Sequence, residues 1–291
     1  MGEGRPGSKV RSSARNGNTQ SARMASGRLS LLDGFELTWD GQTIPLPPAS
    51  QRVLAFLALQ PRPVQRHYVA GTLWAEASSE RAAGNLRSSL WRLGQRDRHL
   101  VRTIGTRLAL APTIDVDVHE AERRARDVIW STGPSYGTSV GYEVLGGGDL
   151  LPDWQEDWVI VERERIRQLH SHALERACAE LVRRGLFAQA IDFGLAAVHE
   201  EPLHDTAHGA LIGAYLAEGN RADALRQFSR YTAIMREELD LGPSPHIASL
   251  LEAIGDPPGW PDEMPRGRDD ASMPAAVVRL APGPQPRSEE P

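Results

Sequence analysis

The sequence has almost no lysine and a single cysteine. Of its 33 lysine and arginine residues, 32 are arginine and only Lys9 is lysine. A phosphate-binding Walker A loop and Schiff-base catalysis both need a lysine, so neither chemistry is expected in a folded part of the chain. Cys178 alone can supply neither an internal disulfide nor a cysteine metal cluster. This favours a reducing, cytoplasmic setting.

Long hydrophobic runs are also missing. The longest, Val53 to Leu59, is far shorter than the roughly 20 residues of a membrane span. The N-terminus lacks the apolar stretch of a secretory signal, and its true start is open between Met1 and Met24. We predict disordered tails at residues 1–27, which are rich in Gly, Ser and Arg, and at the proline-rich residues 256–291.

The charge is unevenly distributed, although the net charge is only −5. Residues 1–111 hold 16 basic and 7 acidic residues, whereas residues 112–265 hold 13 basic and 27 acidic residues. A basic half joined to an acidic half indicates that one part faces nucleic acid and the other does not. The alternative is chance segregation of charge.

Residues 28–118 are predicted to form strands, three helices and a hairpin. A β-prone segment is followed by the turn signal Asp40-Gly41, and prolines then stop the sheet. Because this pattern closes within itself, we expect an independent unit. The predicted elements are strands at 28–39 and 43–44, helices at 50–59, 68–75 and 79–96, and a hairpin of 100–104 with 107–110.

From about Asp115 onward the pattern is helical and contains an internal repeat. At an offset of 34 residues, Gly185 matches Gly219 and Ala190 matches Ala224. This is the period of tetratricopeptide helix pairs. A helix over 151–181 carries Trp154 and Trp158, which we interpret as the core of a cap on the repeats, and a short helix over 247–254 is expected to close them.

The predicted third helix carries the candidate site. Ala82, Leu86, Leu90 and Leu93 fall within about 80° of one another and form its buried stripe. The opposite face has no acid and presents arginine, asparagine and serine, which can bind bases or phosphates. The alternative is an ordinary solvated face, although such a face normally mixes signs of charge. The candidate DNA contacts here are Arg81, Asn85, Ser88, Arg92 and Arg96.

Two further arginines flank the turn of the following hairpin. Arg102 and Arg107 would let a basic wing reach a minor groove or a phosphate.

The sequence shows no set of residues with the spacing of a catalytic site. The G-x-S-x-G match at 137–141 lacks the strand and helix that a nucleophile elbow requires, so we read it as a loop. The nine histidines are interpreted as structural or surface residues, and no metal or cofactor is expected.

Several segments resemble a known family. They are Leu32-Asp-Gly-Phe-Glu-Leu, Asn85-Leu-Arg-Ser-Ser-Leu-Trp-Arg-Leu93, Asp149-Leu-Leu-Pro-Asp-Trp-Gln-Glu-Asp-Trp158 and Arg236-Glu-Glu-Leu-Asp-Leu-Gly-Pro-Ser-Pro245. They are similar to Streptomyces antibiotic regulatory proteins of the AfsR/DnrI/RedD type, in the short, stand-alone form. The resemblance implies a mainly α-helical protein. Its N-terminal winged helix-turn-helix, of the α+β response-regulator effector type, would span 28–118. An all-helical, tetratricopeptide-like bacterial transcriptional activation domain would span 119–255.

The resemblance also implies a function. The protein would be a transcriptional activator, not an enzyme, that binds tandem direct repeats in promoter DNA of a secondary-metabolite cluster. It would associate with itself on DNA and recruit RNA polymerase through sigma and other subunits, in the cytoplasm at the nucleoid and without a membrane partner. The rival interpretation is a scaffold whose repeats bind a partner and whose basic unit contacts nucleic acid nonspecifically.

Overall fold

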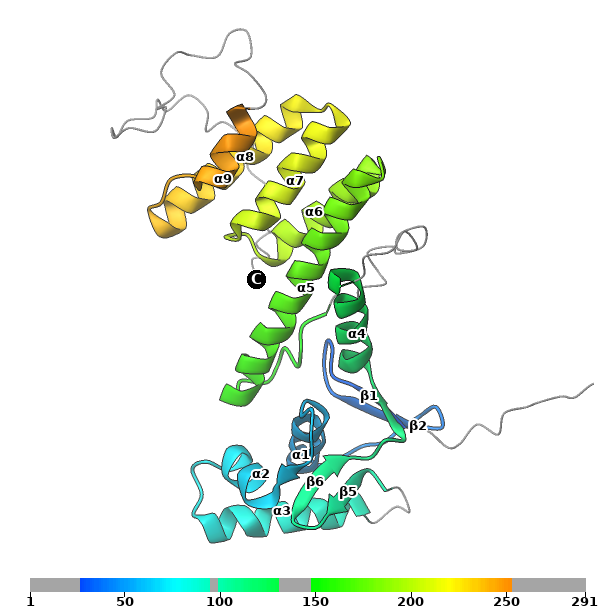
Figure 1. The fold of residues 1–291 in the computed structure, drawn as a ribbon. Helices are drawn as coiled ribbons and strands as arrows, with labels where there is room; N and C mark the ends of the chain where they lie inside the picture. Colours follow the sequence, from blue (N-terminus) through cyan, green and yellow to red (C-terminus); the bar gives the residue numbers. More distant parts are fainter. Residues whose placement is uncertain (1–26, 95–98, 131–147, 253–291) are drawn as a thin grey trace, which may run out of the picture.

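A computed structural model of the protein describes residues 27–94, 99–130 and 148–252, which form two units (Figure 1). The first unit comprises strands β1 (Gly27–Ser30), β2 (Glu36–Trp39), β3 (Gln42–Thr43), β4 (Val64–Gln65), β5 (Val101–Ile104), β6 (Arg107–Leu110) and β7 (Ile114–Val116), with helices α1 (Pro48–Ala58), α2 (Arg66–Leu73) and α3 (Ser79–Gly94). The second comprises α4 (Asp117–Trp130), α5 (Asp157–Arg183), α6 (Phe187–Glu200), α7 (Asp205–Glu218), α8 (Arg221–Leu239) and α9 (Pro245–Glu252). The predicted mainly helical architecture is confirmed. No helix among these residues is long and apolar enough to cross a membrane.

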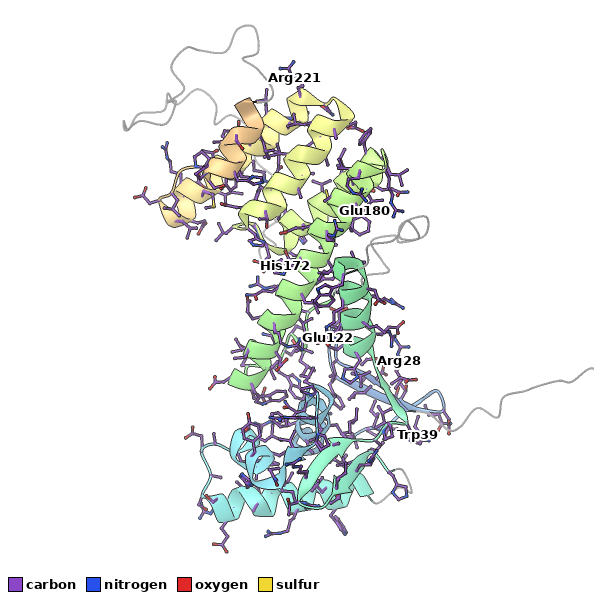
Figure 2. The ribbon with its side chains drawn as sticks, viewed as in Figure 1. Arg28, Trp39, Glu122, His172, Glu180 and Arg221 are labelled. Carbon is purple, nitrogen blue, oxygen red and sulfur yellow. The ribbon has the colours of Figure 1, made fainter. Side chains whose placement is uncertain are left out.

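The first sheet has the strand order β3-β2-β1-β7. The hairpin turn predicted at Asp40-Gly41 is confirmed, with both residues at positive φ. Asp33 and Gly34 also have positive φ and divide the predicted strand 28–39 into β1 and β2. In Figure 2, Arg28 and Trp39 are labelled on these two strands. Gly27 has no room for a side chain, because an added Cβ would lie 2.8 Å from the Trp39 indole.

Strand β7 corrects the expectation that the helical pattern begins at about residue 115. Ile114 and Val116 are buried while Asp115 is exposed, which is the two-residue alternation of a strand. This segment pairs in parallel with β1, so that Ile114 lies opposite Gly27. Only three residues long, the alternation was too short to separate from the start of the next helix.

Helices α1, α2 and α3, with β4 and the hairpin β5–β6, make up the remainder of the first unit. Helix α1 begins with Pro48 at its first turn, where a missing backbone N–H costs nothing. Its Val53, Leu54 and Leu57 are almost fully buried. A second sheet, ordered β4-β6-β5, places the hairpin beside the start of α2. Strand β4 was not predicted.

The 34-residue repeat is confirmed as two successive helix pairs. Gly185 follows α5 and Gly219 caps α7, and both adopt the left-handed conformation that ends a helix. Ala190 of α6 and Ala224 of α8 are fully buried at equivalent positions. Gly194 brings α6 close to α7, because an added Cβ would lie 3.1 Å from the Cα of Leu211. Helix α9 closes the stack, with Ile247 buried.

Trp154 and Trp158 do not cap the repeats, contrary to our interpretation. Trp154 stacks on Phe35 at a centroid distance of 6.0 Å, and Trp158 meets Phe56 of α1 edge-on at 5.3 Å. The predicted helix over 151–181 begins only at Asp157. Trp154 therefore lies in the turn before α5, and both indoles belong to the contact with the first unit.

The core of the first unit is completed by residues from beyond position 118. Leu150, Leu151 and Val159 are at most 1% exposed and belong to the same hydrophobic cluster as the strands and helices of the first unit. Leu151 also donates its backbone N–H to the carbonyl of Leu31 at 2.9 Å. The pattern over 28–118 thus does not close within itself, because its core continues into the start of α5.

Polar contacts hold this junction in place. The Arg163 guanidinium donates to three carbonyl oxygens of the turn, those of Leu150, Leu151 and Trp154, at 2.6–3.0 Å. Arg52 of α1 lies 2.9 Å from the Glu156 carboxylate, Nε to Oε1, and donates to the Leu73 carbonyl oxygen. The Arg163 bonds therefore hold the turn against α5, and the Arg52–Glu156 ion pair joins it to the first unit.

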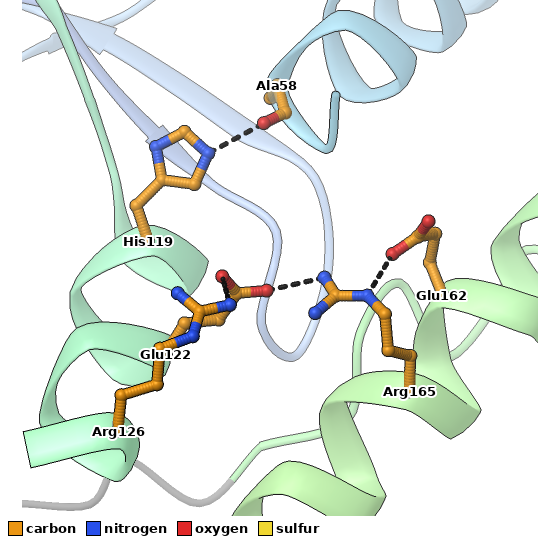
Figure 3. A network of polar contacts seen from close by, with 6 residues as sticks. All are labelled: Ala58, His119, Glu122, Arg126, Glu162 and Arg165. Carbon is orange, nitrogen blue, oxygen red and sulfur yellow. Dashed lines mark hydrogen bonds and ion pairs between the residues drawn. The ribbon is translucent and has the colours of Figure 1, made fainter. Parts of the chain in front are cut away.

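Helix α4 is the second link between the units (Figure 3). His119 donates through Nε2 to the carbonyl oxygen of Ala58, at the end of α1, at 2.7 Å. Glu122 pairs with Arg126 on the same helix and with Arg165 of α5, which also pairs with Glu162. Helix α4 therefore contacts both the end of α1 and the first half of α5.

Candidate nucleic-acid interface

Helix α3 lies at the edge of the first unit remote from the repeats, and Figure 1 shows it along the lower border of the molecule. Its inner side is apolar, as predicted, with Ala82, Leu86 and Leu93 buried and Leu90 partly buried. Ser89 is buried among them and donates its hydroxyl to the carbonyl oxygen of Asn85 at 2.9 Å. The other side of the helix is free to contact a ligand.

The four predicted contacts on the described part of α3 all lie on its exposed side. Arg81, Asn85, Ser88 and Arg92 are exposed and fall within about 60° on a helix of 100° per residue. Within the described ranges, none of these side chains forms a hydrogen bond or an ion pair with another. Their donors are available to bases or phosphates. The fifth, Arg96, lies outside the described residues.

The hairpin β5–β6 presents both of its predicted arginines to solvent. Arg102 pairs in register with Ala109, and Ile104 with Arg107. Because side chains alternate along a strand, Arg102 and Arg107 share the face opposite the buried Leu108. The structure thus places the two arginines together, on a strand pair that lies close to α3.

Side-chain bonds fix the hairpin β5–β6 to the end of β4 and the first residue of α2. Arg66 donates to the hydroxyl of Thr103 at 3.2 Å, and Thr106 donates to the Gln65 amide oxygen at 2.8 Å. The backbone N–H of Arg66 also donates to the carbonyl oxygen of Thr106. The wing is therefore positioned by contacts with the helical part of its own unit.

Sequence reasoning missed two exposed residues of α3. Arg87 is exposed and has no ion pair within the described part of the chain. Trp91 is 65% exposed, which is high for so large an apolar side chain. The signal was present, because both residues fall outside the buried stripe on a helical projection.

Two histidines of the second unit, His170 and His204, pair with carboxylates. His170 lies 2.6 Å from Glu200, and His204 lies 3.0 Å from Glu175, which also accepts from Thr206. In the part of the chain that the structure covers, no three histidine, cysteine or carboxylate side chains are grouped to hold a metal ion. These pairs connect helix α5 with the helices that follow it.

Two buried titratable groups are structural. The pKa of Cys178 rises to about 11 because its thiol is buried, with a smaller contribution from the Glu175 carboxylate, so the thiol stays protonated and unreactive near neutral pH. Cys178 is a core residue. His208 bonds to Gln227 and to the Pro202 carbonyl, and burial lowers its pKa.

The G-x-S-x-G match at 137–141, which we predicted to be a loop, lies outside the described residues.

Comparison with known proteins finds a match for most of the second unit. Residues 145–255, which include α5 to α9, match the family described as the bacterial transcriptional activator domain. The fold is similar to that of Mycobacterium tuberculosis EmbR, solved in complex with a low-affinity phosphopeptide, with a TM-score of 0.57 and 22% identity. The likeness covers 79% of this chain but only 65% of that one, and at this identity it concerns the fold alone. Curated proteins give no match.

Proposed function

We propose that this protein is a sequence-specific DNA-binding activator of transcription. The observation that carries the proposal is the exposed face of α3, whose three arginines form no ion pair with any residue that the structure describes, in a chain whose residues 145–255 match a transcriptional activator domain. The α3 sequence contains one carboxylate, Glu80, which lies in its first turn. An α-helix fits the major groove of B-DNA, and arginine and asparagine are suited to reading guanine and adenine edges.

We assign base and phosphate contact to residues 28–118. In this assignment α3 contributes Arg81, Asn85, Ser88 and Arg92, followed by Arg96, and the wing contributes Arg102 and Arg107. Contacts to bases would set sequence preference, whereas contacts to phosphates would fix the position of the protein on the duplex. The acidic second unit is unsuited to the phosphate backbone and is assigned to protein contacts.

DNA binding is tested with sites that the wild-type protein selects from a random-sequence pool. The triple variant Arg81→Ala/Asn85→Ala/Arg92→Ala should lose at least tenfold in affinity for the selected site, because each good base contact contributes about 1–3 kcal/mol of discrimination. Arg123→Ala, an exposed arginine on α4, is the matched control and should bind as the wild type does. Circular dichroism verifies folding of each variant. If the triple variant binds equally well, α3 is not the reading helix, and the scaffold interpretation is favoured.

We further propose that residues 119–255 mediate self-association on tandem sites and contact with RNA polymerase. Tandem helix pairs present a concave surface suited to a protein segment. Protomers placed head to tail on direct repeats about 10–11 bp apart would lie on the same face of the DNA. In vitro transcription should therefore fall when half a turn is inserted between the sites. Activation that ignores this insertion would contradict the arrangement.

The biological setting follows from the same proposal. An activator of this type, resembling Streptomyces antibiotic regulatory proteins, would act at the nucleoid in the cytoplasm on a secondary-metabolite cluster. Its role would be regulatory, without catalysis or a cofactor. The test is transcript analysis after deletion of the gene, in which a biosynthetic cluster should lose expression.

A further inference from the structure

Trp91 occupies the outermost ridge of α3. With 100° per residue, it lies about 140–180° from the buried Ala82, Leu86 and Leu93. Gly84 and Ser88 share this ridge. Arg81 and Arg92 lie on one side of the ridge and Arg87 lies on the other, all three exposed. A helix that enters a groove brings the ridge opposite its core closest to the groove floor, while the flanks face the walls.

The residues around Trp91 on the surface of α3 include two glycines, which have no side chain. Gly84 lies two turns before it, and a Cβ added there would meet only the Arg87 guanidinium, at 3.8 Å. Gly94 lies one turn after it, and a Cβ added there would meet nothing within 4 Å. The 65% exposed indole therefore rises from a strip of small residues, which leaves space for a flat partner to approach the helix.

The charges around the indole favour DNA over a protein partner. None of the flanking Arg81, Arg87 and Arg92 has an ion pair within the described ranges. Burying them against a protein would require a set of carboxylates, whereas the two phosphate backbones that border a DNA groove supply negative charge on both sides. Trp91 is also the only exposed large apolar side chain on α3, which is less apolar surface than a protein interface core contains.

We propose that Trp91 is a specificity-determining residue that packs against a thymine 5-methyl group in the major groove. This methyl is the apolar group that base pairs present there, and it is absent from cytosine and from uracil. The large face of an indole suits such a contact, and the arginines on both sides position it by holding the phosphates. The inference rests on the proposed DNA-binding function and adds to it a preference for thymine at one position of each half-site.

Uracil substitution provides the test, because it removes the methyl and leaves base pairing intact. In the site selected by the wild-type protein, each thymine is replaced in turn by uracil and affinity is measured by gel shift. At one position per half-site the wild type should lose about fourfold, as expected for one buried methyl group. Trp91→Ala should bind the thymine site more weakly and should show no further loss with uracil at that position. Trp91→Phe should restore part of the difference.

Trp130→Ala is the matched control, since Trp130 on α4 is also 65% exposed. This variant should keep the wild-type affinity and the wild-type response to uracil. If the wild type and Trp91→Ala lose the same affinity when thymine is replaced by uracil, the proposed thymine contact is wrong. It is also wrong if Trp91→Ala binds DNA normally but fails to activate transcription, because that result would indicate that Trp91 contacts a protein partner. If the wild type selects no sequence from the pool, the proposed DNA-binding function fails, and this inference fails with it.

Discussion

The two units of the molecule build their cores over very different distances along the chain. In the first unit, β1 pairs with β7, so that Gly27 lies opposite Ile114, 87 residues further along the chain. In the repeats, bonds between elements join residues about one helix pair apart, such as His170 with Glu200 and Tyr231 with Asp205, separated by 30 and 26 residues. The first unit thus depends on contacts between residues far apart in the sequence, whereas the second is a stack in which each helix contacts its neighbours.

The two units should therefore respond differently when part of the chain is removed or a core residue is replaced. A stack can lose one helix pair and keep the packing of the others, at least in part. The first unit draws Leu150, Leu151 and Val159 into its core from the start of the second. The part that is proposed to bind DNA is therefore energetically dependent on the part that is proposed to activate transcription.

Truncation should give the largest effect. Ending the chain at Val118 removes three almost fully buried aliphatic side chains from the first core, each contributing about 1.5–3 kcal/mol. The combined loss of roughly 5–9 kcal/mol approaches the whole stability of a typical domain. We expect a fragment of residues 27–118 to show no cooperative urea transition and a fragment of residues 27–183 to retain one. A sharp transition in the shorter fragment would mean that its core is complete without the start of α5.

A charge inserted between the repeats should have the next largest effect. Ala190 is fully buried, so Ala190→Asp places an unpaired carboxylate between helices and should cost about 4 kcal/mol or more. Ala188→Asp, at an exposed position of the same helix, is the control. Because the first core ends near Val159, Ala190→Asp should abolish activation in vitro while changing single-site DNA binding by less than about threefold. Parallel loss of both activities would argue against separate stability of the units.

The smallest effect concerns pH and is confined to the repeats. Burial lowers the pKa of His208 in the folded protein. As the pH falls through about 6.5, the ordinary pKa of histidine, His208 therefore takes up a proton in the unfolded chain before it does so in the folded protein. Stability should therefore decrease from pH 7 towards pH 5. Replacement His208→Gln should flatten the dependence of the melting temperature on pH, and His67→Gln, at an exposed position of α2, should leave it unchanged. An unaltered slope in His208→Gln would assign the acid sensitivity to other groups.

The candidate site was largely readable from the sequence because it lies on one helix. A single 16-residue helix with three to four buried positions on one stripe fixes which residues face outward. Arg81, Asn85, Ser88 and Arg92 therefore lie where the pattern put them. The same projection places Arg87 and Trp91 outside the buried stripe, and both are exposed.

The sequence by itself determined the hairpin turn at Asp40-Gly41, the 34-residue repeat and the inner face of α3. Each of these depends on local backbone geometry, whose period is set by the helix or strand. Only the tertiary structure decided that Trp154 and Trp158 pack on Phe35 and Phe56 rather than on the repeats, and that β7 pairs with β1. Periodicity shows that a side chain is buried but carries no information about its partner, because that partner is chosen by packing between segments more than 80 residues apart.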